Sequence, residues 1–161
     1  MEKLECSDII CKIALFGHRD FSEHISLEKI LPRVFENILA KYELLEIFIG
    51  RNGEFDVFTA SVIKRFQKKA GQERCEITLV LPYTVSNIED YQRYYDDIII
   101  PIKSYPKAAI AKRNKWMVEN SDLVLVFVKK THGGAYEAMR YAEKLGKRVI
   151  NLAELDCENN L

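Results

Sequence analysis

Apolar residues occur along this chain in short continuous runs, which alternate with longer stretches of helical periodicity. These mainly apolar runs are typical of buried strands, and they predict strands at residues 9–16, 44–49, 77–81, 122–128 and 148–152. Strands that are apolar throughout and are separated by amphipathic helices indicate a parallel sheet covered on both faces. We therefore expect an α/β fold, a doubly wound three-layer α/β/α sandwich with a mainly parallel sheet of about five strands.

The predicted helices begin and end at residues of the expected kinds. Apolar residues recur at helical spacing over 27–39, and Ser26 before them is a suitable N-cap. Pro32 inside this pattern favours a later start or a kink. Residues 82–105 are rich in tyrosine and are expected to be irregular, with a short apolar run at 98–100. Three further helices are predicted at about residues 55–71, 106–120 and 134–145.

The composition is that of one ordinary globular domain, so we expect residues 1–161 to form a single unit. Hydrophobic residues make up 48% of the 161 residues and charged residues 30%, which suffices for a sizeable core. No apolar run approaches the roughly 20 residues that span a bilayer. The charged first residues do not resemble a signal peptide. A cytoplasmic protein with no membrane contact is expected.

Charge and cysteine usage restrict the possible partners. Lys plus Arg and Asp plus Glu balance at 24 each, which argues against a polyanion and makes nucleic acid an unlikely partner. Residues 98–118 contain no acid and several bases, which suits either a confined anion site or a solvated helix face. The four cysteines and three histidines show no metal-ligand spacing, so no metal is expected. Cys11 and Cys75 lie inside apolar runs and are predicted to be buried.

Glycines and charged residues follow three of the predicted strands. The three loops read Gly17-His18-Arg19-Asp20, Gly50-Arg51-Asn52-Gly53-Glu54-Phe55-Asp56 and Thr131-His132-Gly133-Gly134. Ligands of such sheets bind beyond the carboxyl ends of the strands, where these loops should meet. Backbone N–H groups at glycines and helix starts can receive an anion, and arginines suit phosphate. We therefore predict a site for an anionic small molecule at this edge.

Structural explanations also exist for these residues. Gly17 and Gly50 can simply end strands, and Asp56 can act as a helix N-cap or first-turn acid as readily as it binds a ribose. Arg113 and Asn114 adjoin an apolar helix face and could point into the site, although Arg113 could instead extend into solvent. Local hydrogen bonds or ion pairs are equally open to His18, Asp20 and His132.

No familiar catalytic or cofactor motif is present. The sequence has neither GxxxxGK[ST] nor GxGxxG, so ATP hydrolysis and ordinary NAD binding are not indicated. It also lacks the GxSxG and HExxH motifs of hydrolases. No cofactor is required by this pattern, which offers a binding site more clearly than a reaction.

Taken together, the motifs resemble a known family. Gly17-His18-Arg19, the segment from Gly50 to Asp56, Lys112-Arg113-Asn114-Lys115-Trp116-Met117 and Gly133-Gly134-Ala135 are similar to the YpsA-like proteins of the SLOG (SMF/DprA–LOG) superfamily. The resemblance covers about residues 11–152. It implies a Rossmann-like fold that binds nucleotides, nucleotide-derived signals or nucleic acid, and it implies no settled reaction.

Two relatives in that superfamily suggest different functions. LOG enzymes cleave nucleoside monophosphates with a PGGxGTxxE motif, but here its second glycine and its threonine are missing, and Glu137 lies too close to Gly134. This departure argues against hydrolysis. DprA relatives bind single-stranded DNA, which needs a basic groove with stacking aromatics. The tyrosines here could stack, but their acidic surroundings favour a cleft wall or a subunit contact: Tyr83, Tyr91, Tyr94, Tyr95 and Tyr105.

The favoured interpretation is a non-catalytic sensor or binding module for a nucleotide or nucleotide-derived phosphorylated ligand. The alternative is a nucleoside-phosphate hydrolase, acting on an N-glycosidic or phosphate bond, with Asp56 or Glu54 as the acid–base group. A third possibility is a single-stranded nucleic-acid or protein adaptor. A homo-oligomer is also expected. The ligand-binding residues predicted are Gly17, His18, Arg19, Gly50, Arg51, Asn52, Gly53, Asp56, Arg113, Asn114, His132, Gly133 and Gly134.

Overall fold

One parallel sheet forms the centre of the molecule. The structure is a computed structural model that describes residues 9–101 and 106–155. Within these residues the sheet has six strands in the order β4-β3-β2-β1-β5-β6, and all neighbours run parallel. The strands are β1 (Ile10–Gly17), β2 (Leu44–Ile49), β3 (Cys75–Val80), β4 (Asp97–Ile99), β5 (Leu123–Phe127) and β6 (Arg148–Asn151). The expected α/β sandwich with a parallel sheet is confirmed, with one strand more than expected.

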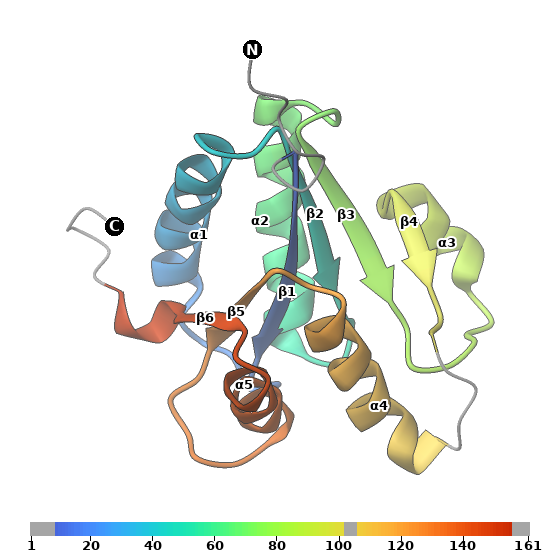
Figure 1. The fold of residues 1–161 in the computed structure, drawn as a ribbon. Helices are drawn as coiled ribbons and strands as arrows, with labels where there is room; N and C mark the ends of the chain where they lie inside the picture. The colour runs from blue at the N-terminus through green and yellow to red at the C-terminus, as the bar shows by residue number, and fades with distance from the viewer. Residues whose placement is uncertain (1–8, 102–105, 156–161) are drawn as a thin grey trace.

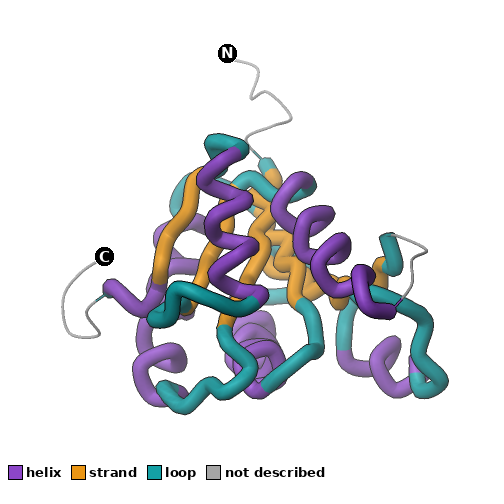
Figure 2. Tube along the Cα trace, turned by 90° about the horizontal axis from the view of Figure 1, so that it is seen from below, coloured by secondary structure: helices purple, strands orange, loops and turns teal. Residues whose placement is uncertain are grey.

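Helices cover both faces of this sheet (Figures 1 and 2). On one face lie α1 (His24–Leu39) and α2 (Glu54–Ala70), and on the other lie α4 (Pro106–Glu119) and α5 (Gly134–Lys144). Strand β1 illustrates the packing, since Ile13 and Leu15 belong to the core under α1 and α2, whereas Ala14 and Phe16 belong to the core under α4 and α5. Alternate residues of a strand point to opposite faces, so burial of both faces requires a continuous apolar run.

The tyrosine-rich segment differs from its irregular prediction. It contains the helix α3 (Ile88–Tyr94) and the edge strand β4, which pairs with β3. A three-residue strand and a seven-residue helix are too short to show a clear hydrophobic period. A short 3-10 helix (Leu152–Glu154) follows β6. The predicted stacking or wall residue Tyr105 lies outside the described residues.

The start of α1 was predicted wrongly. Its N-cap is Glu23 rather than Ser26, so Pro32 lies well inside the helix. Apolar residues on both sides of the proline, such as Leu27 and Val34, are buried in the core. Packing of an amphipathic face supplies most of the stability of a helix within a protein, which is how α1 tolerates an interior proline.

The strand order creates a crevice between β1 and β5. After β1 the chain adds β2, β3 and β4 on one side, and it then returns to add β5 and β6 on the other. Connections that leave β1 and β5 therefore turn to opposite faces, which opens a crevice beyond their carboxyl ends. Gly17 at the end of β1 pairs with Phe127 at the end of β5. In the described part of the chain, no helix is both long and apolar enough to cross a membrane.

Candidate functional site

A cleft of about 350 Å³ opens at the carboxyl edge of the sheet, over the crevice between β1 and β5. It is lined by the loops after β1, β2 and β5 and by one side of α4. All the predicted ligand-binding residues line this cleft except Arg51 and Gly53. Of the two candidate acid–base residues, Asp56 lines the cleft and Glu54 does not. Residues distant in sequence thus meet at one place, and their role in binding stays a prediction.

Arg113 is the central cation of the cleft and is only 3% exposed. Its guanidinium donates from Nη1 to the Val80 carbonyl at 2.9 Å, from Nη2 to Asn52 Oδ1 at 3.0 Å and from Nε to Asn114 Oδ1 at 2.8 Å. These acceptors are neutral, and burial lowers the pKa of the guanidinium, opposed by the nearby Asp56. A guanidinium carries five N–H donors, so two have no partner among the described residues. Arg113 is therefore held rigidly, with donor capacity left for an anion.

Asp56 faces Arg113 across Gly50. A Cβ added to Gly50 would lie 2.7 Å from Arg113 Nη1 and 3.1 Å from Asp56 Oδ2, so only glycine lets the two side chains approach this closely. Asp56 Oδ2 also accepts the Asn52 N–H at 2.9 Å, which fixes the loop after β2. Burial raises the pKa of the Asp56 carboxyl, although the Asn52 N–H and Arg113 oppose this rise. Asp56 is therefore the carboxyl whose charge acts on Arg113 in the cleft.

The other glycines have separate structural reasons. A Cβ on Gly17 would lie 2.1 Å from Cγ of Phe55, so this glycine makes room for a core ring. A Cβ on Gly53 would lie 2.6 Å from Cα of Arg19, so this glycine lets the loops after β1 and β2 touch. Gly133 has a φ of +96°, a conformation that favours glycine. At Gly134 a Cβ would meet only Asn114 Nδ2, at an ordinary 3.7 Å. Packing therefore does not require Gly134 to be a glycine.

Two helices begin at the cleft with glycine N-caps. Gly53 precedes α2 and Gly133 precedes α5, and in the described structure no side chain caps either helix. The first N–H groups of a helix lack partners within the helix and carry its positive dipole. Since Gly133 and Gly134 line the cleft, the start of α5 offers backbone donors there. This end of the cleft suits a phosphate.

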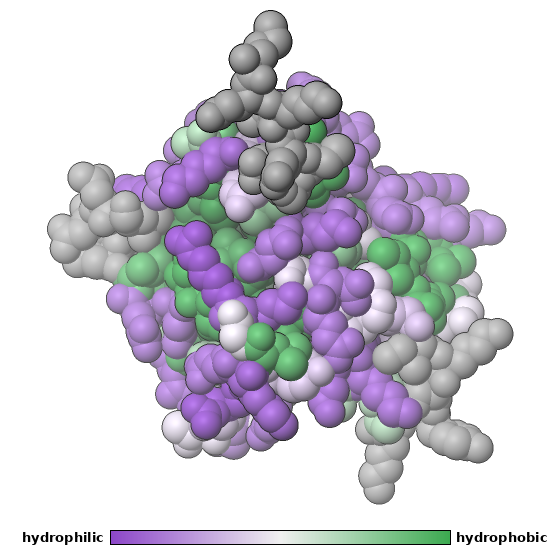
Figure 3. Space-filling model, in the orientation of Figure 1, coloured by the Kyte–Doolittle hydropathy of each residue, from purple (hydrophilic) through white to green (hydrophobic). Residues whose placement is uncertain are grey.

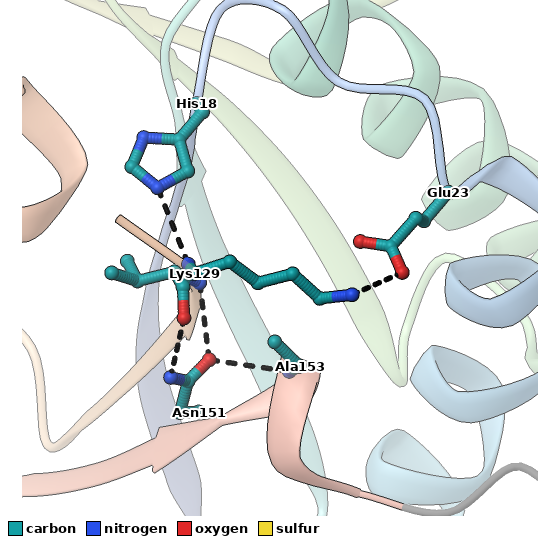
Figure 4. Close-up of polar contacts among 6 residues, drawn as sticks. His18, Glu23, Lys129, Asn151 and Ala153 are labelled. Carbon is teal, nitrogen blue, oxygen red and sulfur yellow. Dashed lines mark hydrogen bonds and ion pairs between the residues drawn. The ribbon is translucent and has the colours of Figure 1, made fainter.

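The loop after β5 is anchored by residues around Lys129 (Figure 4). Asn151 accepts the Val128 N–H at 3.1 Å and donates to the Val128 carbonyl at 2.9 Å. His18 Nε2 accepts the Lys129 N–H at 3.4 Å, which joins the loops after β1 and β5. Burial and, to a lesser extent, the positive charge of Lys130 lower the pKa of the His18 imidazole. A lower pKa favours the neutral ring, which can accept the Lys129 N–H. His18 thus helps to shape the cleft.

Two charged residues of the cleft were not among the predicted ligand-binding residues. Lys130 and Asp20 line it and form an exposed ion pair, with Lys130 Nζ 2.7 Å from Asp20 Oδ2. Lys130 immediately precedes the predicted loop that begins at Thr131, so its position after a strand was the available signal. The Lys130 ammonium therefore lines the cleft in which an anion is predicted to bind.

Arg51 lies outside the cleft. Its guanidinium lies 4.8 Å from the centroid of the Tyr91 ring and donates from Nη1 to the Tyr95 hydroxyl at 3.2 Å. These contacts join the loop after β2 to α3. Glu54 lies in the same region, is exposed, and donates its N–H to the Arg19 carbonyl at 3.0 Å. In this structure Arg51 connects secondary-structure elements.

Residues 9–101 and 106–155 contain no cluster of His, Cys, Asp and Glu that could hold a metal ion. Cys11 and Cys75 are 3% and 0% exposed, which confirms their predicted burial. Burial raises the pKa of the Cys11 thiol to about 11 and that of Cys75 to about 12. Neither thiol is a candidate nucleophile at neutral pH.

Comparison with known proteins identifies the fold. No family model and no curated protein matches the sequence. Two solved structures of DNA processing protein A (DprA) do match in structure. The *Streptococcus pneumoniae* protein superposes with a TM-score of 0.64 at 18% identity, over 87% of this chain and 49% of that one. The Helicobacter pylori protein, described for its single-stranded DNA binding mode, superposes with a TM-score of 0.56 at 16% identity. This match covers 86% of this chain and 63% of that one.

These likenesses define the class of the fold. The chain has the Rossmann-like α/β fold found in DprA structures. It spans about half the length of the S. pneumoniae protein and somewhat under two thirds of the H. pylori protein. At 18% and 16% identity, the likeness concerns the fold alone.

Proposed function

We propose that the cleft binds the phosphate of a nucleotide or nucleotide-derived ligand and that the protein acts as a sensor or binding module. The observation that carries this proposal is Arg113, a buried cation that hydrogen-bonds to neutral oxygens and retains unused donors. A buried charge is costly unless an opposite charge compensates it, and a phosphate in the cleft would supply that charge. We also propose that the chain is a YpsA-like member of the SLOG superfamily, as its motifs suggest.

The lining of the cleft supports one arrangement of this ligand. The phosphate would lie at the start of α5, against the N–H groups near Gly134, with Arg113 and Lys130 beside it. Asn52 and Asp56, on the opposite loop, would hydrogen-bond a ribose hydroxyl. In this arrangement Gly134 is a glycine because a side chain there would occupy the phosphate position.

A hydrolytic alternative would depend on Asp56, the one of the two candidate acid–base residues that lines the cleft. Asp56→Asn and Glu54→Gln are matched acid-to-amide changes in the first turn of α2. If a 5′-mononucleotide yields either a free base with ribose 5-phosphate or a nucleoside with inorganic phosphate, and only Asp56→Asn abolishes this product, the protein is an enzyme. We expect no product, which chromatography of prolonged incubations would detect.

Single-stranded DNA is a second candidate ligand, despite the neutral net charge. The observation that favours it is the fold shared with the *H. pylori* protein described for single-stranded DNA binding. Such binding should weaken steeply with salt, because each phosphate contact releases a counterion. A ligand held mainly by one phosphate should show a much shallower salt dependence.

Calorimetric titration tests the proposal directly. The four 5′-ribonucleoside monophosphates, the matching nucleosides and an oligo(dT) strand are titrated into the wild type and into Gly134→Leu. We expect at least one nucleotide to bind, its nucleoside to bind about a hundredfold more weakly and Gly134→Leu to lose the nucleotide. Equal binding of nucleotide and nucleoside would refute a phosphate site. The melting temperature of Gly134→Leu checks that the variant folds.

A further inference from the structure

A second cavity continues the cleft along the other side of α4. It is a groove of about 670 Å³ between α4 and α5, larger than the cleft itself. Ile110, Asn114 and Gly134 line both cavities. The cleft and the groove therefore adjoin each other at these three residues.

The groove carries an excess of positive charge. Its lining includes the cations Lys115, Arg140 and Lys144 and a single carboxylate, Glu137. Arg140 also pairs with Glu143 at 3.2 Å, but this pair is exposed and therefore weak. Hydrophilic side chains dominate the surface around α4 and α5 in Figure 3. The charge of the groove thus favours an anionic occupant.

The groove also has an aromatic wall. Tyr141 lines it, and its hydroxyl donates to Glu119, which fixes the ring. Lys115 Nζ lies 5.4 Å from the centroid of this ring. A half-buried ring beside cations is the combination that holds a base and its phosphate in single-strand binding sites. The apolar residues Ile110 and Ala138 complete the wall.

The length of the groove exceeds that of one nucleotide phosphate and sugar. Gly134 and Lys144 are ten residues apart on α5, which corresponds to about 15 Å along the helix axis. A second copy of this chain is a poor occupant, because a two-fold contact would bring the same cations together. An extended molecule with a second phosphate fits both the length and the charge.

We infer that the ligand is a linear dinucleotide, whose 5′-phosphate lies in the cleft and whose next phosphate and base lie in the α4–α5 groove. This inference rests on the proposed function, since it assumes that the first phosphate binds at Gly134. It assigns the second phosphate to Lys115 and Lys144 and the second base to the Tyr141 ring.

Comparison of mononucleotides with dinucleotides tests the inference. The four 5′-mononucleotides and the four 5′-phosphorylated homodinucleotides are titrated into the wild type and into the double variant Lys115→Gln/Lys144→Gln. The control is Lys68→Gln/Lys69→Gln, which removes two exposed lysines from the last turn of α2. The control and the groove variant therefore have the same net charge. Both double variants keep the cleft intact.

The expected results separate the groove from the cleft. A dinucleotide should bind about tenfold more tightly than its mononucleotide, and the groove variant should lose this advantage while the control keeps it. Equal affinities, or equal effects of the two double variants, would overturn the inference and leave the proposed function standing. If neither probe binds the wild type, the proposed function fails and the inference fails with it.

Discussion

Lys129 and Lys130 are adjacent lysines that differ in their relation to the cleft. Lys130 lines it and pairs with Asp20, whereas Lys129 lies outside the cleft lining and pairs with Glu23 (Figure 4). Both ion pairs are exposed: the side chains are 44% and 73% exposed for Lys130 and Asp20, and 54% and 36% for Lys129 and Glu23. Loss of either pair should therefore change the free energy of unfolding very little.

Ligand affinity should distinguish the two lysines sharply. A hydrogen bond from an ammonium to a phosphate contributes about 1.5 kcal/mol or more, so Lys130→Gln should weaken nucleotide binding about tenfold. Lys129→Gln removes the same charge one residue away and should change the affinity less than twofold. Calorimetry with the best-bound 5′-mononucleotide measures both dissociation constants under the same conditions.

Two results would refute this reasoning. If both variants weaken binding equally, the lysines act through the general field of the protein and the cleft contact does not exist. If neither variant changes the affinity, Lys130 does not contact the phosphate. Matched melting temperatures of the two variants would show that the comparison concerns binding rather than folding.

Three further predictions concern stability and reactivity. Gly17→Ala should lower the free energy of unfolding by about 1–3 kcal/mol, because its Cβ would overlap the Phe55 ring; a loss below about 0.5 kcal/mol in urea titrations would contradict this packing. Burial raises the pKa of Asp56 above its unfolded value, so its stabilising protonation is present at low pH and is lost as pH rises through the folded pKa. Urea titrations from about pH 4 to about pH 7 should therefore show Asp56→Asn gaining stability relative to the wild type with rising pH, and a constant difference would refute the shift. With the other two cysteines changed to serine, Cys11 and Cys75 should react with a thiol reagent only after unfolding, and rapid labelling of the native protein would contradict their burial.

Much of the fold could be predicted because both faces of its central strands are buried. The run 123–127 is therefore apolar at every position and the run 44–49 at every position except Glu46, and the helices between the strands show one apolar stripe. The short elements α3 and β4 gave no such pattern. The start of α1 was missed because Ser26 has the right chemistry for an N-cap, whereas tertiary packing extends the helix to His24.

The candidate site could be predicted only as far as chain topology determines it. Parallel strands bring their following loops to one edge, so the glycine loops were expected to meet. Sequence could not show that Gly17 accommodates Phe55, or that Arg51 turns to Tyr91 and Tyr95, because those partners lie about 40 residues away in the chain. Long-range contacts of this kind are set by packing and leave no local motif.

The measurement that tests the central claim most directly is an amide NMR titration of the isotopically labelled protein with 5′-mononucleotides. Backbone N–H groups that receive a phosphate should shift strongly, so we predict saturable shifts at Gly133, Gly134 and Ala135, with the Arg113 side-chain N–H groups following the same binding curve. The matching nucleosides should leave these signals in place. Saturable shifts confined to other parts of the sheet, or no shifts with any nucleotide, would contradict a phosphate site at the start of α5.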